Sequence, residues 1–140
     1  MPAARPTADD HDLVVLRVPA EPRYARVLRI AVSAYAVRLG LPPAAVEDLR
    51  LAVDEALILL LGSTVADEAE GKSAGSTIVL ALDADGDRPP VSVEMRLEPD
   101  PDRVEADPSA LSRFEEIVPS GVAIAAVDQR HGRVALRHPA

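Results

Sequence analysis

Residues 49–63 (LRLAVDEALILLLGS) place a carboxylate next to a run of apolar side chains. They form the second half of a predicted helix, and the polar residues on one side of this helix end at Glu55. A helix carboxylate can act as an acid or base, or it can form an ion pair. Ile58, Leu59 and Leu61 follow Glu55 on the same side. Two interpretations remain open for these apolar residues: packing into the core, or an exposed patch that binds a partner.

Three further patterns suggest chemistry but lack residues that the chemistry requires. Residues 70–73 (EGKS) resemble the end of a phosphate-binding loop, but Ala66 replaces its first Gly and a strand follows instead of a helix. Residues 83–87 (DADGD) resemble a calcium loop, but Arg88 occupies the position of its Gly. The histidines are scattered along the chain, at His11, His131 and His138. We therefore predict a flexible loop, a hairpin turn and no metal site.

Two helices are expected to position the carboxylate. Apolar residues recur at steps of three and four in residues 21–40 and again in residues 41–62. Gly40 suits the C-terminal cap of the first helix, and Pro43 suits the first turn of the second. We expect the second helix to end at Gly62 and a small, polar loop to follow.

Apolar, β-branched runs predict five strands, with a short helix between the third and the fourth. The expected ranges are 13–18, 76–83 and 89–97 for the first three strands, 109–118 for the short helix, and 121–138 for the last two strands with their turn. Asp107 or Ser109 could cap the short helix. The order β-α-α-β-β-α-β-β predicts an α+β fold, a two-layer sandwich with helices on one face of a mixed β-sheet. Residues 13–138 would form a single domain after a flexible tail, residues 1–12.

The composition excludes several classes of function. Lys and Arg number 15 against 23 Asp and Glu, a formal net charge of −8, whereas nucleic-acid binding needs a basic face. The longest uninterrupted apolar run, residues 56–61, is too short to span a membrane. The chain has no Cys, and residues 1–12 lack the apolar core of a signal peptide. We therefore expect a cytoplasmic protein that binds neither nucleic acid nor membrane, and its charge permits a basic protein partner.

Residues 14–55 resemble the start of a known bacterial family. A strand that ends in VPA, the motif YARV at residues 24–27 and the motif AVDEA at residues 52–56 occur in the family's order. In these features the chain resembles the anti-sigma-factor serine/threonine protein kinases, which have the histidine-kinase-like ATPase fold, also called the GHKL or Bergerat fold. The resemblance implies the same fold for this chain.

The resemblance also implies a nucleotide site, and the chain departs from the family's pattern in three places. Active relatives continue E-A-x-x-N-A, in which the Glu is the general base and the Asn binds the magnesium that holds ATP. Glu55 matches the Glu, but Leu59 replaces the Asn, and the chain contains no Asn. The adenine-binding motif D-x-G-x-G would fall near Arg96 or Leu97, and residues 98–107, without a Gly, replace the Gly-rich ATP lid. We expect a degenerate pocket without a lid that binds neither ATP nor magnesium, made of Asp54, Glu55, Ile58, Leu59 and Arg96.

Two interpretations remain open for Glu55. It could be a working general base, as in active relatives, or a carboxylate that is solvated or paired with Arg50 or with the first helix. The three departures from the family's motifs favour the second interpretation, in which the base position is vestigial.

The resemblance implies that the chain is an anti-sigma factor. Such a protein would sequester an alternative sigma factor of RNA polymerase and be released by an anti-anti-sigma protein with a STAS domain. Arg26 matches the family's arginine that contacts both partners, and its neighbours Arg23, Tyr24 and Arg29 would extend the contact. Relatives generally form homodimers, so we expect a homodimer. The alternatives are an active kinase that phosphorylates a Ser of the antagonist, and an interaction domain for another partner.

Overall fold

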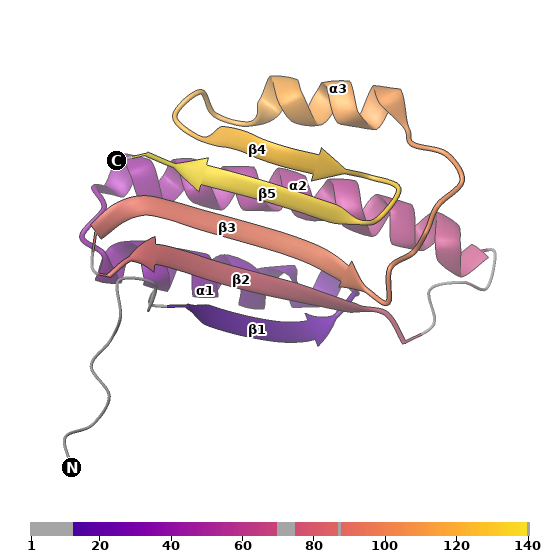
Figure 1. The fold of residues 1–140 in the computed structure, drawn as a ribbon, viewed down its shortest axis with the longest axis horizontal. Coiled ribbons are helices and arrows are strands. Elements are labelled where there is room, and N and C mark those ends of the chain that lie inside the picture. The colour runs from indigo at the N-terminus through magenta and orange to yellow at the C-terminus, as the bar shows by residue number, and fades with distance from the viewer. Residues whose placement is uncertain (1–12, 70–74, 87, 140) are drawn as a thin grey trace, which may run out of the picture.

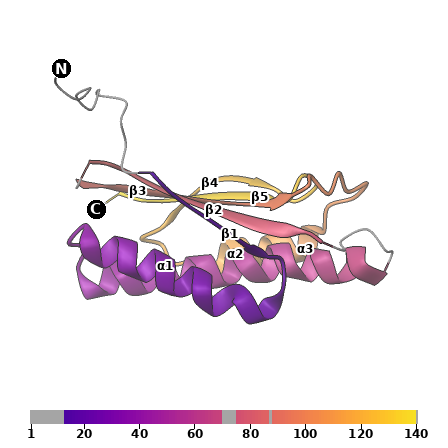
Figure 2. The same ribbon diagram turned by 90° about the horizontal axis from the view of Figure 1, so that it is seen from below.

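The helices of the chain lie against one face of a β-sheet in this computed structural model (Figure 1; Figure 2). The structure describes residues 13–69, 75–86 and 88–139. In these ranges the elements are β1 (Val14–Pro19), the 3-10 helix η1 (Pro22–Tyr24), α1 (Ala25–Arg38), α2 (Pro43–Ala69), β2 (Thr77–Asp85), β3 (Arg88–Glu98), α3 (Pro108–Ile117), β4 (Ala123–Asp128) and β5 (Arg133–His138). The predicted α+β class is confirmed, and so is the coverage of one sheet face by helices.

All the strand pairs of the sheet are antiparallel, so the prediction of a mixed sheet is wrong. The strand order is β1-β2-β3-β5-β4, and each neighbouring pair runs in opposite directions. A parallel pair would arise if β4 returned beside β3 after the α3 crossover. Instead β4 lies at the edge of the sheet, and β5 fills the position between β3 and β4 (Figure 1).

Helix α1 ends where the sequence predicts. Gly40 has a φ of 77°, a left-handed conformation that glycine adopts without a steric penalty. Its amide donates to the carbonyl of Val37 at 2.9 Å, and the amide of Leu41 donates to the carbonyl of Ala36 at 3.1 Å. These bonds satisfy carbonyls at the end of the helix and let the chain turn into α2.

Helix α2 does not end at Gly62, which corrects the prediction. It continues to Ala69, through most of the segment expected to be a loop. Gly62 is not among the described glycines with positive φ, so it is an interior helix residue rather than a cap. A glycine inside a helix costs about 1 kcal/mol relative to alanine, which the apolar packing of the preceding turns can offset.

The core lies between the sheet and the helices. Alternate residues of β2 and β3 face the helices and are buried: Ile78, Leu80, Leu82, Val91, Val93, Met95 and Leu97. Helix α2 packs against them with Leu49, Ala52, Val53, Ala56, Leu57 and Leu60. Helices long and apolar enough to cross a membrane do not occur among the described residues.

Local signals account for the other connections. The expected hairpin forms between β2 and β3, with Ala84 opposite Val91. Asp107 caps α3, because its side chain accepts hydrogen bonds from the amides of Ser109 at 3.1 Å and Ala110 at 3.2 Å. The predicted tail (1–12) and the EGKS segment (70–73) lie outside the described residues.

Candidate functional site

The structure separates the three apolar residues that follow Glu55 on α2. Leu59 is 6% exposed and Leu61 is 8% exposed, and both belong to the core. Ile58 is 55% exposed and points away from the core. Core packing is therefore confirmed for two of the three, and a partner-binding role stays a prediction for Ile58.

Glu55 lies half-buried on the same helix. In the described part of the chain it takes part in no ion pair or side-chain hydrogen bond. Arg50, its predicted partner, instead pairs with Glu47 at 3.3 Å. The proposed pairing with Arg50 is therefore wrong, because Arg50 finds a carboxylate three residues away on its own helix.

The carboxylate that joins the two helices is Asp54. Arg29 Nη1 of α1 donates to Asp54 Oδ1 of α2 at 2.9 Å, and both side chains are about one-third exposed. A pair of this exposure contributes modestly to stability, but it fixes which residues of α1 and α2 lie side by side. Arg29 is thus engaged within the chain, although the sequence suggested a contact with a partner.

The other predicted partner-binding residues gather at the start of α1. Arg23 donates to Glu21 at 2.7 Å, and its guanidinium lies 5.2 Å from the centre of the Tyr24 ring. Arg26 is exposed, and no ion pair or side-chain hydrogen bond engages it in the parts of the chain described. Among the four predicted contact residues, Arg26 is therefore the cation most available to a partner.

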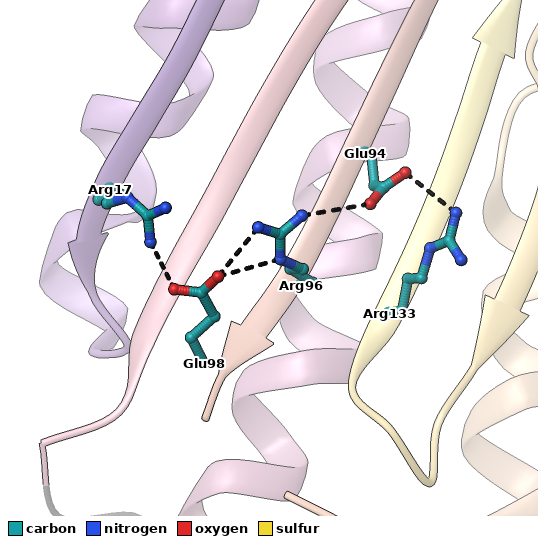
Figure 3. A network of polar contacts seen from close by, with 5 residues as sticks. All are labelled: Arg17, Glu94, Arg96, Glu98 and Arg133. Carbon is teal, nitrogen blue, oxygen red and sulfur yellow. Dashed lines mark hydrogen bonds and ion pairs between the residues drawn. The ribbon is translucent and has the colours of Figure 1, made fainter. Parts of the chain in front are cut away.

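Arg96 does not join the predicted pocket, because it lies on the opposite face of the sheet. Its neighbours Met95 and Leu97 face the helices and are buried, so Arg96 points away from them. There Arg96 Nη2 donates to Glu98 Oε1 at 2.9 Å, and Arg96 Nη1 lies 3.7 Å from Glu94 Oε1 (Figure 3). The predicted pocket residues therefore do not come together. Leu59 lies in the core, Ile58 is exposed to solvent, Asp54 pairs with α1, and Arg96 lies on the far face of the sheet.

Arg96 belongs to a row of ion pairs that crosses the sheet (Figure 3). Arg17 of β1 pairs with Glu98 of β3, and Arg133 of β5 donates to Glu94 of β3 at 3.1 Å. The hydrogen bonds from Arg96 and Arg17 hold the pKa of Glu98 below its ordinary value. Sequence analysis missed this row, although alternating charges at positions 94, 96 and 98 of a predicted strand could have indicated it.

One apolar residue is buried beneath this row. Val79 of β2 is 2% exposed, yet it lies on the face of the sheet that the helices do not cover. In the register of the sheet it stands between Arg17 and Arg96, whose aliphatic stems can cover it. The charged row therefore also shields apolar surface on the open face.

The connection between β3 and α3 is tied to the turn between β4 and β5. The amide of Arg103 donates to the carbonyl of Arg130 at 2.8 Å, and Arg130 Nε donates to the carbonyl of Arg103 at 3.0 Å. Arg103 Nη1 also donates to the carbonyl of Gln129 at 2.7 Å. His131 Nδ1 lies 2.9 Å from Asp100 Oδ2. This segment, in which the resemblance would place an ATP lid, is thus attached to the sheet at several points.

The charges in this contact shift two pKa values in opposite directions. The backbone amide of Asp102 and then the His131 side chain lower the pKa of Asp100. The hydrogen bond with Asp100 raises the pKa of His131. Each group favours the charged form of the other. Groups of three or more acidic or histidine side chains that could hold a metal ion do not occur within the described ranges.

Comparison with known proteins shows similarity to one kind of kinase. The serine-protein kinase RsbW of Listeria monocytogenes is 43% identical over 47 residues, which are 34% of this chain and 30% of that protein. The RsbW kinase of Oceanobacillus iheyensis is 33% identical over 63 residues, covering 45% of this chain and 40% of the relative. The RsbW kinase of Bacillus velezensis is 34% identical over 61 residues, covering 44% and 38%.

These matches are partial. Each spans 40% or less of the relative's length, and no protein-family model matches the chain. The partial similarities support a relationship between this chain and the RsbW serine-protein kinases.

Proposed function

We propose that this chain is an anti-sigma factor that sequesters an alternative sigma factor of RNA polymerase. The observation that carries the proposal is the partial similarity to RsbW kinases, which agrees with the resemblance of residues 14–55 to anti-sigma-factor kinases. The exposed cation of Arg26, at the family's contact position, supports it. We further propose that the protein acts in the cytoplasm as a homodimer.

We also propose that the chain does not bind Mg-ATP in the manner of active relatives. Leu59, where those relatives have the magnesium-binding Asn, packs into the core and has no oxygen to offer a cation. The segment in place of the lid contains no Gly, so its amides cannot approach phosphates closely. Two of its carboxylates, Asp100 and Asp107, are engaged within the chain. The residues present therefore do not fit the nucleotide, and Glu55 would be vestigial as a base.

Without phosphorylation, release of the sigma factor would follow mass action. A STAS-domain antagonist that binds the same surface would free the sigma factor once the ratio of its concentration to its dissociation constant exceeds the same ratio for the sigma factor. Active relatives instead reset the switch by phosphorylating a Ser of the antagonist.

Direct binding tests this proposal. Each alternative sigma factor of the source organism would be purified and measured against the full chain by biolayer interferometry. We expect one of them to bind with submicromolar affinity and to be displaced by a STAS-domain protein in the absence of ATP. If none binds, the chain is an interaction domain for another partner.

The second candidate function is an active serine kinase, which the names of the RsbW relatives favour. Isothermal titration calorimetry with Mg-ATP distinguishes the two. The proposal expects no heat of binding, and a dissociation constant in the micromolar range would support the kinase.

A further inference from the structure

Residues 99–107, which connect β3 to α3, are held to the rest of the chain by polar contacts rather than by apolar packing. We call this segment the strap. Each of its residues is exposed or half-buried, and its most apolar side chain, Val104, is 81% exposed. Both ends are fixed, because Glu98 belongs to β3 and Asp107 caps α3. The middle of the strap therefore adds little to the core and can move without unpacking it.

The strap is attached to the turn between β4 and β5, which it passes in Figure 1. The amide of Arg103 and the side chain of Arg130 each donate to the other residue's backbone carbonyl, at 2.8 Å and 3.0 Å. Arg103 Nη1 donates to the carbonyl of Gln129 at 2.7 Å. A Cβ added to Gly132 would lie 3.1 Å from Pro101 Cγ, so the strap packs directly against the backbone of the turn. Because these contacts share a few residues, the loss of one should weaken the others.

The turn that the strap contacts buries a polar side chain with unmet hydrogen bonds. Gln129 is 7% exposed, and neither its amide nitrogen nor its amide oxygen finds a hydrogen-bond partner among the residues that the structure describes. Its backbone carbonyl, by contrast, accepts hydrogen bonds from Arg103 and Gly132. Burial of a polar group without partners costs free energy, so the closed strap is less stable than its own hydrogen bonds would make it.

We propose that the strap opens as a unit while the sheet and the helices stay folded, and that opening exposes the Gln129 amide to water. The contacts that carry this proposal all lie within the chain, so it stands apart from the proposed function. In the open state the Gln129 amide gains hydrogen bonds, which offsets part of the cost of releasing Arg103. Opening therefore requires less free energy than global unfolding.

His131 makes the state of the strap depend on pH. Its Nδ1 lies 2.9 Å from Asp100 Oδ2 of the strap, and the charges of Asp102 and Asp128 also act on it. The charge of Arg103 acts on Asp100 in turn. The protonated ring attracts the strap, and the hydrogen bond with Asp100 raises the pKa of His131. Loss of this positive charge, as pH rises through the raised pKa, should favour the open state.

Hydrogen exchange of backbone amides, measured by NMR on the full chain, tests the proposal. The reporter is the amide of residue 103, which donates to Arg130, and the reference is the set of amides in β3. Arg103→Ala removes the side-chain bond to Gln129 and keeps the reporter amide. Gln129→Met keeps the length of the side chain and removes its polar atoms. The matched control is Arg113→Ala, at an exposed arginine of α3. Protection factors correct for the intrinsic pH dependence of exchange.

In wild type, we expect the protection factor of the reporter amide to be about tenfold or more below those of the β3 amides. Arg103→Ala should lower it by about fivefold or more, Gln129→Met should raise it by about twofold or more, and the control should leave it unchanged. Between about pH 5 and about pH 8 it should fall in wild type but stay level in His131→Gln.

Equal protection at residue 103 and in β3 would overturn the proposal, because the strap would then open only when the whole chain unfolds. Faster exchange of the reporter in Gln129→Met would also overturn it, because the buried amide would then stabilise the closed strap. A fall with pH that persists in His131→Gln would overturn the control by this histidine.

Discussion

Leu51 and Leu59 are the same residue type on one helix, yet they differ in exposure from 45% to 6%. Substituting Leu59 by Asn would bury an amide among apolar side chains, which should lower the free energy of unfolding by about 1–3 kcal/mol. Leu51→Asn is the matched control and should change it by less than about 0.5 kcal/mol. Urea and thermal unfolding would be measured with and without Mg-ATP. A rise in the melting temperature of Leu59→Asn on adding nucleotide would show that the site still binds ATP.

At the residue scale, binding should depend on Arg26. It is exposed and available, and charged hydrogen bonds at an interface are costly to lose. Arg26→Ala should therefore weaken sigma-factor binding by about tenfold or more. The control is Arg113→Ala, an exposed arginine on α3, which should have little effect. Both variants should melt close to wild type, and surface plasmon resonance gives the affinities. Equal affinities for wild type and Arg26→Ala would remove this residue from the interface.

At the scale of elements, replacing Gly40 or Gly62 by alanine should change the stability of the protein in opposite directions. Gly62 lies inside α2, and a Cβ added there meets no atom within 4 Å. Gly62→Ala should therefore stabilise the protein by about 0.5–1 kcal/mol. Gly40 has a φ of 77°, so Gly40→Ala should destabilise it by about 1–2 kcal/mol. Chemical denaturation measures both. Destabilisation by Gly62→Ala would indicate that the helix ends there after all.

These glycines also show what sequence can predict. The cap at Gly40, the β2–β3 hairpin and the Asp107 cap follow from neighbouring residues, and all three form as local rules indicate. Whether Gly62 ends a helix depends on its φ angle, which tertiary packing decides. The position of β5 between β3 and β4 is likewise non-local, so a mixed sheet could not be excluded from the order of elements.

In the candidate site, too, some features follow from the local sequence and others depend on tertiary packing. That Glu55 is followed by core residues could be inferred from helical spacing, but the exposure of Ile58 required the packed structure. The ion pair of Arg29 with Asp54 depends on how α1 packs on α2. Sequence alone assigned Arg29 to a partner protein and Asp54 to the nucleotide pocket, and it did not predict that the two side chains pair. The placement of Arg96 could have been predicted from the sequence, because successive side chains of a strand point to opposite faces of the sheet and Leu97 is apolar.

The contact between the β3–α3 connection and the β4–β5 turn should respond to pH. His131 has a raised pKa, mainly through Asp100 and less through Asp128 and Asp102. Its stabilising contribution is complete below its unfolded value of 6.5 and is lost as pH rises through the raised folded value. The stabilising contribution of Asp100 is complete above its unfolded pKa of 3.8 and is lost as pH falls through its lowered folded pKa. The contact should therefore be strongest between pH 3.8 and pH 6.5, the two unfolded pKa values.

Titration of the histidine ring by NMR tests this contact. The pKa of His131 should lie above 6.5 in wild type and return toward that value in Asp100→Asn. Glu105→Gln, in the same connection, is the control and should leave the pKa in place, because Glu105 is not among the groups that shift it. His131→Gln assigns the resonance. An unchanged pKa in Asp100→Asn would show that the ion pair does not form in solution.

At the scale of the whole molecule, the two faces differ in what they can bind. On the face away from the helices, Arg17, Glu98, Arg96, Glu94 and Arg133 form a row of ion pairs over Val79 (Figure 3). Beyond the end of this row, Val15 of β1 is 51% exposed on the same face. The outer side of α1 and α2 instead carries apolar residues with available charges. Because the helical face combines exposed apolar side chains with the available cation of Arg26, whereas the charges of the open face are paired with one another, the helical face is the better candidate interface.

The net charge of −8 should govern how fast a basic partner associates. Opposite net charges attract over distances comparable to the Debye length, which shrinks from about 10 Å at 0.1 M salt to about 3 Å at 1 M. Raising NaCl from about 50 to about 500 mM should therefore slow association with the sigma factor by about tenfold or more. The dissociation rate should change much less, because salt screens the long-range attraction between the separated proteins more than the contacts made within the complex. Stopped-flow kinetics at several salt concentrations measure both rates, with sucrose at matched osmolarity as the control. An association rate that ignores salt would mean that net charge does not steer the encounter.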